Sequence, residues 1–220
     1  MNRKFFEDLS LINNDPNQKK AFDSKGNTVV IAGPGSGKTR VLTLKAVKLC
    51  KTDIVAPSGL ACISYSRETV RELKKRLSEY NYKPKKSDFI GTMHGFSIIN
   101  ILEPFAKLYP QYNIPIPLKI ASKEIEEKIF ISVLSELNIT DNSLNLTDLN
   151  RQRSLSISGN SKVQLELFDL ESQAEVIYNR KLKEVGCVDF ISIINIATQM
   201  ITEQEYVKNI LLYYDNTPMG

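Results

Sequence analysis

The chain has 220 residues, of which 42% are apolar and 25% charged, and its formal net charge is +4. This length suits one or two domains, and the composition is typical of globular proteins. No apolar run reaches the roughly 18 residues that cross a membrane, and the N-terminus lacks the apolar core of a signal peptide. Cys50, Cys62 and Cys187 have no pairing pattern and predict free thiols, which favours a cytoplasmic protein without a membrane partner.

The first predicted elements surround a glycine-rich segment. Asp15 is a suitable N-cap and Pro16 a suitable first helical residue, so we expect a short helix that ends near Asp23. Residues 28–31 are β-rich and predict the first core strand. A helix is expected from Arg40 onward.

Residues 32–39 have the composition of a phosphate-binding loop between a strand and a helix, the Walker A pattern. Glycines let the backbone take positive φ and aim N–H groups inward, and the following helix adds its positive end. We then expect Lys38, as the catalytic cation, to lie between the β- and γ-phosphates, and the Thr39 hydroxyl to bind Mg²⁺. Ala32 stands where the pattern has glycine. The alternative is an ordinary glycine-rich turn. The loop residues are Gly33, Pro34, Gly35, Ser36 and Gly37.

Two more strands are expected to pair with the first. Residues 60–64 and 89–92 read as short strands, and residues 67–79 form an amphipathic helix between them. Another helix begins near Gly95. Strands that alternate with helices at this spacing predict an α/β domain with a parallel sheet.

The composition changes after residue 102, where prolines break the chain into short pieces. We expect a helix that begins after Ser122, a long loop over residues 138–162, and helices over residues 163–185 and 190–200. Residues 210–214 read as a strand that returns to the core. The predicted organisation is therefore a first core part, 1–102, a helical insertion, 103–187, and a return to the core, 188–220.

Polar, aromatic and cationic residues follow the second and third predicted strands. Ser64, Tyr65 and Arg67 come directly after one strand, and Thr92 and His94 end or follow the other. Open α/β sheets bind ligands at the carboxyl ends of their strands, so both groups are expected at the edge that carries the loop. Tyr65 could instead be a core aromatic, and His94 could instead cap the next helix.

These segments together resemble the UvrD/Rep family of superfamily one helicases. Residues 15–21 look like the family's Q motif, 32–40 like motif I, 61–66 like motif Ia and 90–96 like motif Ib. Residues 186–190 resemble the segment that closes the family's inserted helical subdomain. The resemblance covers nearly the whole chain, and the order and spacing of the motifs make it specific.

The resemblance implies a P-loop NTPase with a RecA-like core, which binds ATP and Mg²⁺ and moves on single-stranded DNA. It implies that Gln18 reads the adenine, that Arg40 joins the nucleotide site, and that Asp215 is the second metal ligand. It further implies that Tyr65 meets DNA bases and that Ser64, Arg67, Thr92 and His94 contact the strand. The residues of the implied nucleotide site are Gln18, Gly33, Pro34, Gly35, Ser36, Gly37, Lys38, Thr39 and Arg40.

Several positions depart from the family pattern. Arg67 and Glu68 replace its usual Asn-Lys pair, and Met93 replaces an aromatic. Asn216 stands where the family has the glutamate that activates water, so the chain lacks a clear Asp-Glu pair. The arginines of the second motor domain are absent, so a C-terminal motor half or a partner nuclease is expected to complete the enzyme. The alternative is a nucleotide-dependent DNA-binding module that does not hydrolyse ATP.

Overall fold

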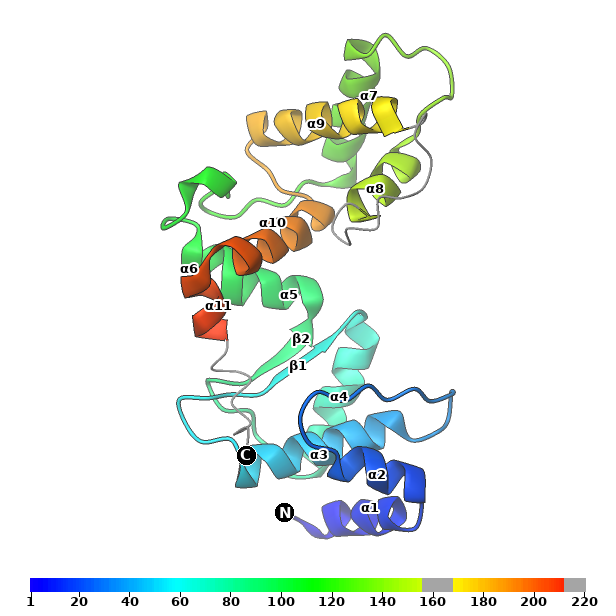
Figure 1. Ribbon diagram of the computed structural model, residues 1–220, viewed down its shortest axis with the longest axis vertical. Coiled ribbons are helices and arrows are strands. Elements are labelled where there is room, and N and C mark those ends of the chain that lie inside the picture. The colour runs from blue at the N-terminus through cyan, green and yellow to red at the C-terminus, as the bar shows by residue number, and fades with distance from the viewer. Residues whose placement is uncertain (156–167, 212–220) are drawn as a thin grey trace. The chain divides into compact units, whose positions relative to one another are not determined.

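The computed structural model describes residues 1–155 and 168–211, and the chain divides into two compact units (Figure 1). The first unit comprises Met1–Phe96 and the segment that begins at Lys208, and the second comprises Ser97–Val207. The predicted insertion, 103–187, lies within the second unit. No helix in the described ranges is long and apolar enough to cross a membrane.

The first unit is an α/β arrangement with a small parallel sheet. Its elements are α1 (Arg3–Asn13), α2 (Pro16–Asp23), α3 (Lys38–Thr52), β1 (Ala61–Ser64), α4 (Arg67–Glu79) and β2 (Phe89–Thr92). Strands β1 and β2 pair in parallel, with Ala61 opposite Phe89 and Ser64 opposite Thr92. Helix α4 makes the crossover between them, as a parallel pair requires. This confirms the prediction of an α/β unit with parallel strands.

Apolar side chains from the helices and strands of the first unit form one core. Residues Phe5, Ile12, Phe22, Leu44, Val47, Cys62, Leu73, Leu77 and Ile90 are all buried in it. Helix α4 buries Val70, Leu73 and Leu77, the stripe that its sequence predicts, and the last two belong to this core. Tyr80, just after α4, donates a hydrogen bond to Asp8 of α1 at 2.8 Å, which ties the N-terminal helix to this core.

The predicted strand over residues 28–31 does not form, and this is a correction to the sequence analysis. Val29 and Ile31 are 87% and 96% exposed. A strand needs a hydrogen-bonded neighbour, and the described part of the sheet contains only β1 and β2, which pair with each other. The residues therefore run as an irregular segment from α2 to the glycine-rich loop.

The predicted strand over residues 210–214 is also wrong at its start. Ile210 and Leu211 are the last residues of α11 (Glu205–Leu211), and the other three residues lie outside the described ranges. An apolar run of this length fits a helix end as well as a buried strand.

The second unit is helical. Its elements are α5 (Met93–Ser97, which begins in the first unit), the π-helical turn η1 (Ile98–Leu102), α6 (Glu103–Phe105), the 3₁₀ turn η2 (Pro110–Tyr112), α7 (Lys123–Glu136), α8 (Leu146–Leu155), α9 (Phe168–Glu184), α10 (Phe190–Glu203) and α11, which ends in the first unit. Pro104 lies just after η1 and has no backbone N–H to donate within the helix. The N–H of Glu103 bonds to the carbonyl of Ile98, five residues earlier.

Helix α8 corrects the prediction of a long loop over residues 138–162. Asn145 caps it, because its side-chain oxygen accepts a hydrogen bond from the N–H of Asp148 at 2.9 Å. Leu149 and Arg153 of α8 are buried. Residues 156–162 lie outside the described ranges. The predicted helix over 163–185 is confirmed by α9 from Phe168 onward, and α10 confirms and extends the helix predicted over 190–200.

Candidate functional site

The glycine-rich loop joins the irregular segment 28–31 to α3. Gly35 and Gly37 take the left-handed conformation, with φ of 75° and 82°, where L side chains are strained. Gly37 is also the N-cap of α3, and its carbonyl accepts the first helical hydrogen bond, from the N–H of Val41 at 3.0 Å. Gly33 does not have a positive φ, so only two of the three glycines behave as predicted. The N-terminus of α3 therefore faces the space that the loop encloses.

Lys38 folds its side chain back into the loop. Its ammonium donates hydrogen bonds to the carbonyl oxygens of Ala32 and Gly33, the latter at 2.7 Å. The side chain is exposed, so the ammonium can exchange these carbonyls for an anionic ligand in the same curve. Ser36 closes the turn, and its hydroxyl donates to Gly33 O at 2.8 Å. Pro34 is exposed at the loop tip.

Gln18 lies against the other side of the loop. Its backbone N–H donates to Asp15 Oδ1, and its side-chain Nε2 donates to Asp15 Oδ2, both at 3.1 Å. A Cβ on Gly37 would come within 3.1 Å of Gln18 Nε2. Gln18 Oε1 is buried and has no hydrogen-bond partner within the described residues. Buried acceptors are normally paired. The unpaired Gln18 oxygen is therefore available to accept a hydrogen bond from a ligand at the loop.

Lys45 holds α2, and therefore Gln18, in position on α3. Its ammonium donates to the carbonyl and the hydroxyl of Ser24, both at 2.6 Å, and to the carbonyl of Ala21 at 3.2 Å. Burial, followed by repulsion from Lys48, lowers the pKa of Lys45. These bonds also satisfy carbonyls at the C-terminal end of α2.

The structure describes only one of the two candidate metal ligands, Thr39 and Asp215. Thr39 is half-buried in the first turn of α3, next to Lys38, and Arg40 is half-buried beside it. Asp215 lies outside the described residues, as does Asn216. Within the described ranges, no three His, Cys, Asp or Glu side chains gather in a way that could hold a metal ion.

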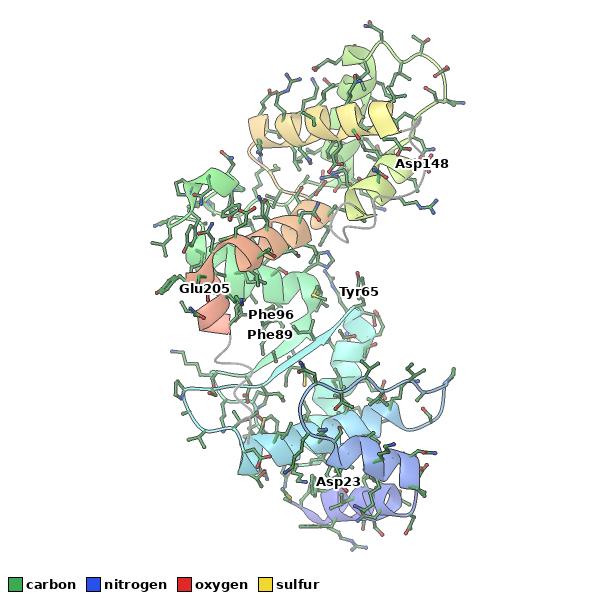
Figure 2. All side chains as sticks on the ribbon, in the orientation of Figure 1. Asp23, Tyr65, Phe89, Phe96, Asp148 and Glu205 are labelled. Carbon is green, nitrogen blue, oxygen red and sulfur yellow. The ribbon has the colours of Figure 1, made fainter. Side chains whose placement is uncertain are left out.

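The second candidate group follows β1. Figure 2 shows Tyr65 at the end of this strand, and its side chain is 86% exposed, which rules out a core position. Ser64 is half-buried as the last residue of β1, and Arg67 is exposed as the first residue of α4. Ser66 caps α4 by accepting from the N–H of Thr69 at 3.1 Å. This cap fixes the turn that presents Tyr65.

The third group follows β2, in register with the second. Ser64 and Thr92 are partners across the sheet, so both candidate groups lie together at the carboxyl ends of β1 and β2. Thr92 Oγ1 accepts from the N–H of Gly95 at 3.1 Å and caps α5. His94 is half-buried in the first turn of α5, so Thr92 rather than His94 is the cap.

Gly91 of β2 leaves room for the ring of Phe89. The Phe89 ring folds over it, and a Cβ on Gly91 would lie 2.5 Å from a Phe89 ring atom. Phe89 meets Phe96 edge-on, with ring centroids 5.2 Å apart (Figure 2). The aromatic pair therefore supports the turn that carries Thr92 and His94.

The sequence profile of the UvrD/REP helicase N-terminal domain matches residues 14–216. The chain belongs to this family. The ATP-dependent DNA helicase Rep of Buchnera aphidicola subsp. Schizaphis graminum is 25% identical to it over 206 residues, which cover 88% of this chain and 30% of that protein. The ATP-dependent DNA helicase PcrA of Staphylococcus aureus is 24% identical over 212 residues, covering 88% of this chain and 26% of that protein.

A shorter match adds a third relative. The probable DNA helicase II homolog of Mycoplasma capricolum is 36% identical over 67 residues, which cover 30% of this chain and 9% of that protein. The chain thus spans less than a third of the length of these relatives. Every candidate residue from Gln18 to His94 lies inside the matched part of this UvrD/REP helicase N-terminal domain, and so does Asp215.

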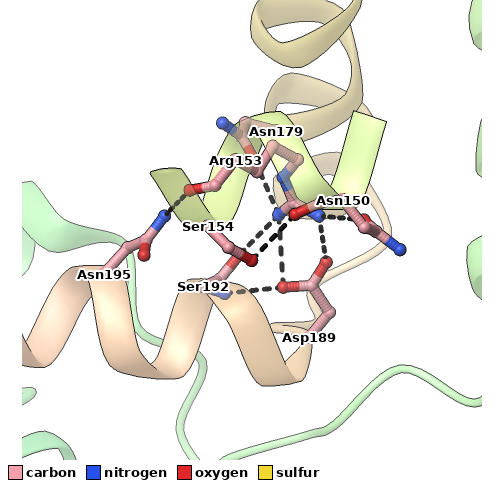
Figure 3. A network of polar contacts seen from close by, with 7 residues as sticks. All are labelled: Asn150, Arg153, Ser154, Asn179, Asp189, Ser192 and Asn195. Carbon is pink, nitrogen blue, oxygen red and sulfur yellow. Dashed lines mark hydrogen bonds and ion pairs between the residues drawn. The ribbon is translucent and has the colours of Figure 1, made fainter. Parts of the chain in front are cut away.

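The sequence analysis of this UvrD-family chain missed a buried polar network in the second unit (Figure 3). Arg153 and Asp189 are only 1% and 3% exposed, and their side chains pair at 2.6 and 3.2 Å. Arg153 also donates to Asn150, Asn179 and Ser192, and its guanidinium stacks 4.5 Å from the Tyr178 ring centroid. The available signal was the Asn145–Asp148 cap spacing, which marks α8 inside the supposed loop.

Asp189 has two roles in this network. Its carboxylate accepts from the N–H of Ser192 at 2.7 Å and so caps α10. Burial alone would raise the pKa of Asp189, but Arg153 and Ser192 outweigh burial and hold the pKa below its ordinary value. The residues over 186–190 that resemble the closing segment of the family's insertion thus join α8, α9 and α10.

Proposed function

We propose that this chain is the ATP-binding motor half of a UvrD-like, ATP-dependent DNA helicase with a RecA-like parallel core. The single observation that carries the proposal is the loop between Gln18 and α3. A curved glycine-rich backbone, an ammonium inside the curve and an unpaired buried amide oxygen beside it supply the three contacts that an adenine nucleotide needs. Family membership supports the same proposal.

The nucleotide contacts follow from the chemistry of the loop residues. Gln18 Oε1 would accept a hydrogen bond from the adenine amino group, because it has no other described partner. Lys38 would leave the carbonyls of Ala32 and Gly33 to contact the β- and γ-phosphate oxygens. The backbone of Gly33, Pro34, Gly35, Ser36 and Gly37 would surround the phosphates at the positive end of α3. Arg40 lies within the same first turn and completes this positive field.

We propose Thr39 and Asp215 as the residues that hold Mg²⁺. A hydroxyl next to the phosphate-binding lysine is a usual oxygen ligand for this ion, and the second ligand would be a carboxylate. When bound, Mg²⁺ neutralises charge that develops between the β- and γ-phosphates. Hydrolysis further needs a carboxylate that positions water and an arginine that stabilises the developing charge. We assign these to a C-terminal motor half or a partner nuclease.

The DNA contacts are proposed at the edge where β1 and β2 end. Tyr65 offers an exposed ring, and stacking on an aromatic side chain suits every base, so this contact is tolerant of sequence. Ser64 and Thr92 offer hydroxyls, and Arg67 and His94 offer nitrogen donors for the strand. These residues would bind single-stranded DNA in the cytoplasm.

A competition experiment tests the nucleotide proposal. A fluorescent Mg·ATP analogue is bound to the chain and displaced by ATP, GTP or AMP. We expect AMP to bind at least about a hundredfold more weakly than ATP, because it lacks the phosphates that Lys38 contacts. GTP should bind about tenfold more weakly, because its ring presents a carbonyl to Gln18 Oε1. Equal displacement by AMP and ATP would refute a phosphate-binding loop.

A further inference from the structure

The modest net charge of the chain hides a strong separation of charge between its two parts. Residues 1–96 contain 18 Lys and Arg against nine Asp and Glu, a formal charge of +9. Residues 97–220 contain 11 against 16, a formal charge of −5. Such asymmetry indicates that the first unit, but not the second, meets a polyanion.

Helix α4 concentrates these cations on one face. Its buried side presents Val70, Leu73 and Leu77. At 100° per residue, four exposed cations fall within an arc of about 100° on another side: Arg67, Arg71, Lys74 and Lys75. We call these four residues the α4 basic stripe. At 1.5 Å per residue it extends about 12 Å along the helix.

The α4 basic stripe is not neutralised within the described residues. None of its four side chains lies within 4.0 Å of a described carboxylate, whereas Arg76 on the next face pairs with Glu72 at 2.9 Å. Arg67 and Arg71, and again Arg71 and Lys75, are like charges four residues apart, a spacing that destabilises a helix. A stripe that opposes folding in this way points to an anionic partner.

We propose that the α4 basic stripe binds the phosphate backbone of double-stranded DNA. Phosphates of one strand recur every 3.4 Å along the duplex axis, so about 12 Å of helix can meet three or four of them. The contact would fix the position of the duplex without reading its sequence. The inference depends on the proposed function only in taking DNA as the polyanion.

The surface of α4 favours a duplex over a single strand. Proteins that bind single strands combine a basic groove with aromatic platforms for the bases. The exposed large apolar side chains of the described residues include Tyr65, before the helix, but none from α4 itself. Tyr65 therefore suits a single strand at the sheet edge, while Arg71, Lys74 and Lys75, further along the helix, suit phosphates alone.

The test compares two probes and two charge-matched variants of the whole chain. The probes are a blunt 20-base-pair duplex and a 20-nucleotide oligothymidine. One variant is Arg71→Gln with Lys75→Gln, and the control is Lys25→Gln with Lys51→Gln, which removes two exposed cations elsewhere on the first unit. Dissociation constants are measured over a series of salt concentrations.

We expect the stripe variant to bind the duplex about tenfold more weakly, with a slope of log affinity against log salt that is shallower by about two. Its oligothymidine affinity should change less than about twofold, and the control should retain both affinities. Unchanged duplex binding, or equal losses in the two variants, would overturn the proposal. A loss confined to oligothymidine would assign the stripe to the single strand and overturn it as well.

Two further variants distinguish a loss of the phosphate contact from a loss of folding and from a failure of the proposed function. Exchanging the cations, Arg71→Lys with Lys75→Arg, should retain duplex affinity, and loss there would contradict a contact made through charge. The glutamine variant should have an equal or higher thermal midpoint, because like-charge repulsion is relieved. Tyr65→Ala should weaken only oligothymidine binding. If that variant binds oligothymidine normally while duplex binding still depends on the stripe, the proposed strand site fails and this inference stands.

Discussion

The side-chain amide of Gln18 fills the space where Gly37 would carry a Cβ, since that atom would lie 3.1 Å from Gln18 Nε2. The contact connects the first turns of α2 and α3, and it sets the unpaired Gln18 Oε1 beside the glycine-rich loop. Asp15 holds the amide from the opposite side by accepting from Nε2. The proposed adenine contact therefore depends on a glycine nineteen positions further along the chain.

Substitution of Gly37 by alanine should abolish the preference for ATP over GTP, because the new methyl group displaces Gln18. Gly35→Ala is the matched control: its φ of 75° is close to the 82° of Gly37, and a Cβ there meets nothing within 4 Å. Both variants should lose roughly 1–2 kcal/mol of unfolding free energy to left-handed strain. Nucleotide competition measures the preference, and an ATP-to-GTP ratio that is equal in the two variants would show that the contact is unimportant.

Replacing Tyr65 by alanine should weaken single-stranded DNA binding by about 1–3 kcal/mol, the usual contribution of one stacked base. Its thermal midpoint should stay near that of the wild type, because the ring is exposed. Fluorescence anisotropy with labelled oligothymidine measures the affinity. Phe6→Ala, which removes another exposed ring of the first unit, should leave binding unchanged, and equal losses in both variants would exclude a specific platform at Tyr65.

Asp189→Asn should destabilise the second unit by about 3–5 kcal/mol at pH 7, because it leaves the charge of Arg153 buried without its partner. Urea unfolding measures the difference. Glu136→Gln, which removes a surface partner of Arg180 and Lys181, is the control and should have little effect. An equally small effect at Asp189 would show that the buried pair does not stabilise this unit.

The difference in unfolding free energy between the wild type and Asp189→Asn should also depend on pH. The pKa of Asp189 is lowered in the folded state, so its ionisation stabilises the fold above the unfolded pKa of about 3.9. That contribution is lost as the pH falls through the folded pKa. The gap in unfolding free energy between wild type and Asp189→Asn should therefore be constant from about pH 7 to 5 and narrow near pH 3.5. A gap that widens in acid would contradict the assigned direction.

Local signals in the sequence were sufficient to predict much of the secondary structure of the first unit. Asp15 before Pro16 marks the start of α2, and Ser66 before an amphipathic run marks α4. The Asp15 cap forms as predicted, and the structure adds the Ser66 cap; each involves only residues within one helical turn. The parallel pairing of β1 and β2 follows from the helix between them. The strand over 28–31 could not be judged in this way, because a strand depends on a neighbour from elsewhere in the chain.

Long-range pairing limited what the sequence could reveal about the sites. Arg153 and Asp189 are 36 residues apart, and nothing local to either residue indicates that they are buried together. Gln18 was identified as a nucleotide residue only through the family resemblance, and its contact with Gly37 comes from the packing of α2 on α3. The lysine and glycines of the loop, in contrast, could be identified from their own sequence pattern.

The account's central claim is that the loop binds the phosphates of ATP through Lys38, and titration of a fluorescent Mg·ATP analogue tests it most directly. Lys51→Ala is the matched control, because it removes an exposed lysine from the other end of α3. We predict that Lys38→Ala weakens binding about a hundredfold, as expected when a charge-assisted phosphate contact is lost, while Lys51→Ala binds like the wild type. Equal affinities for the wild type and Lys38→Ala would contradict the claim.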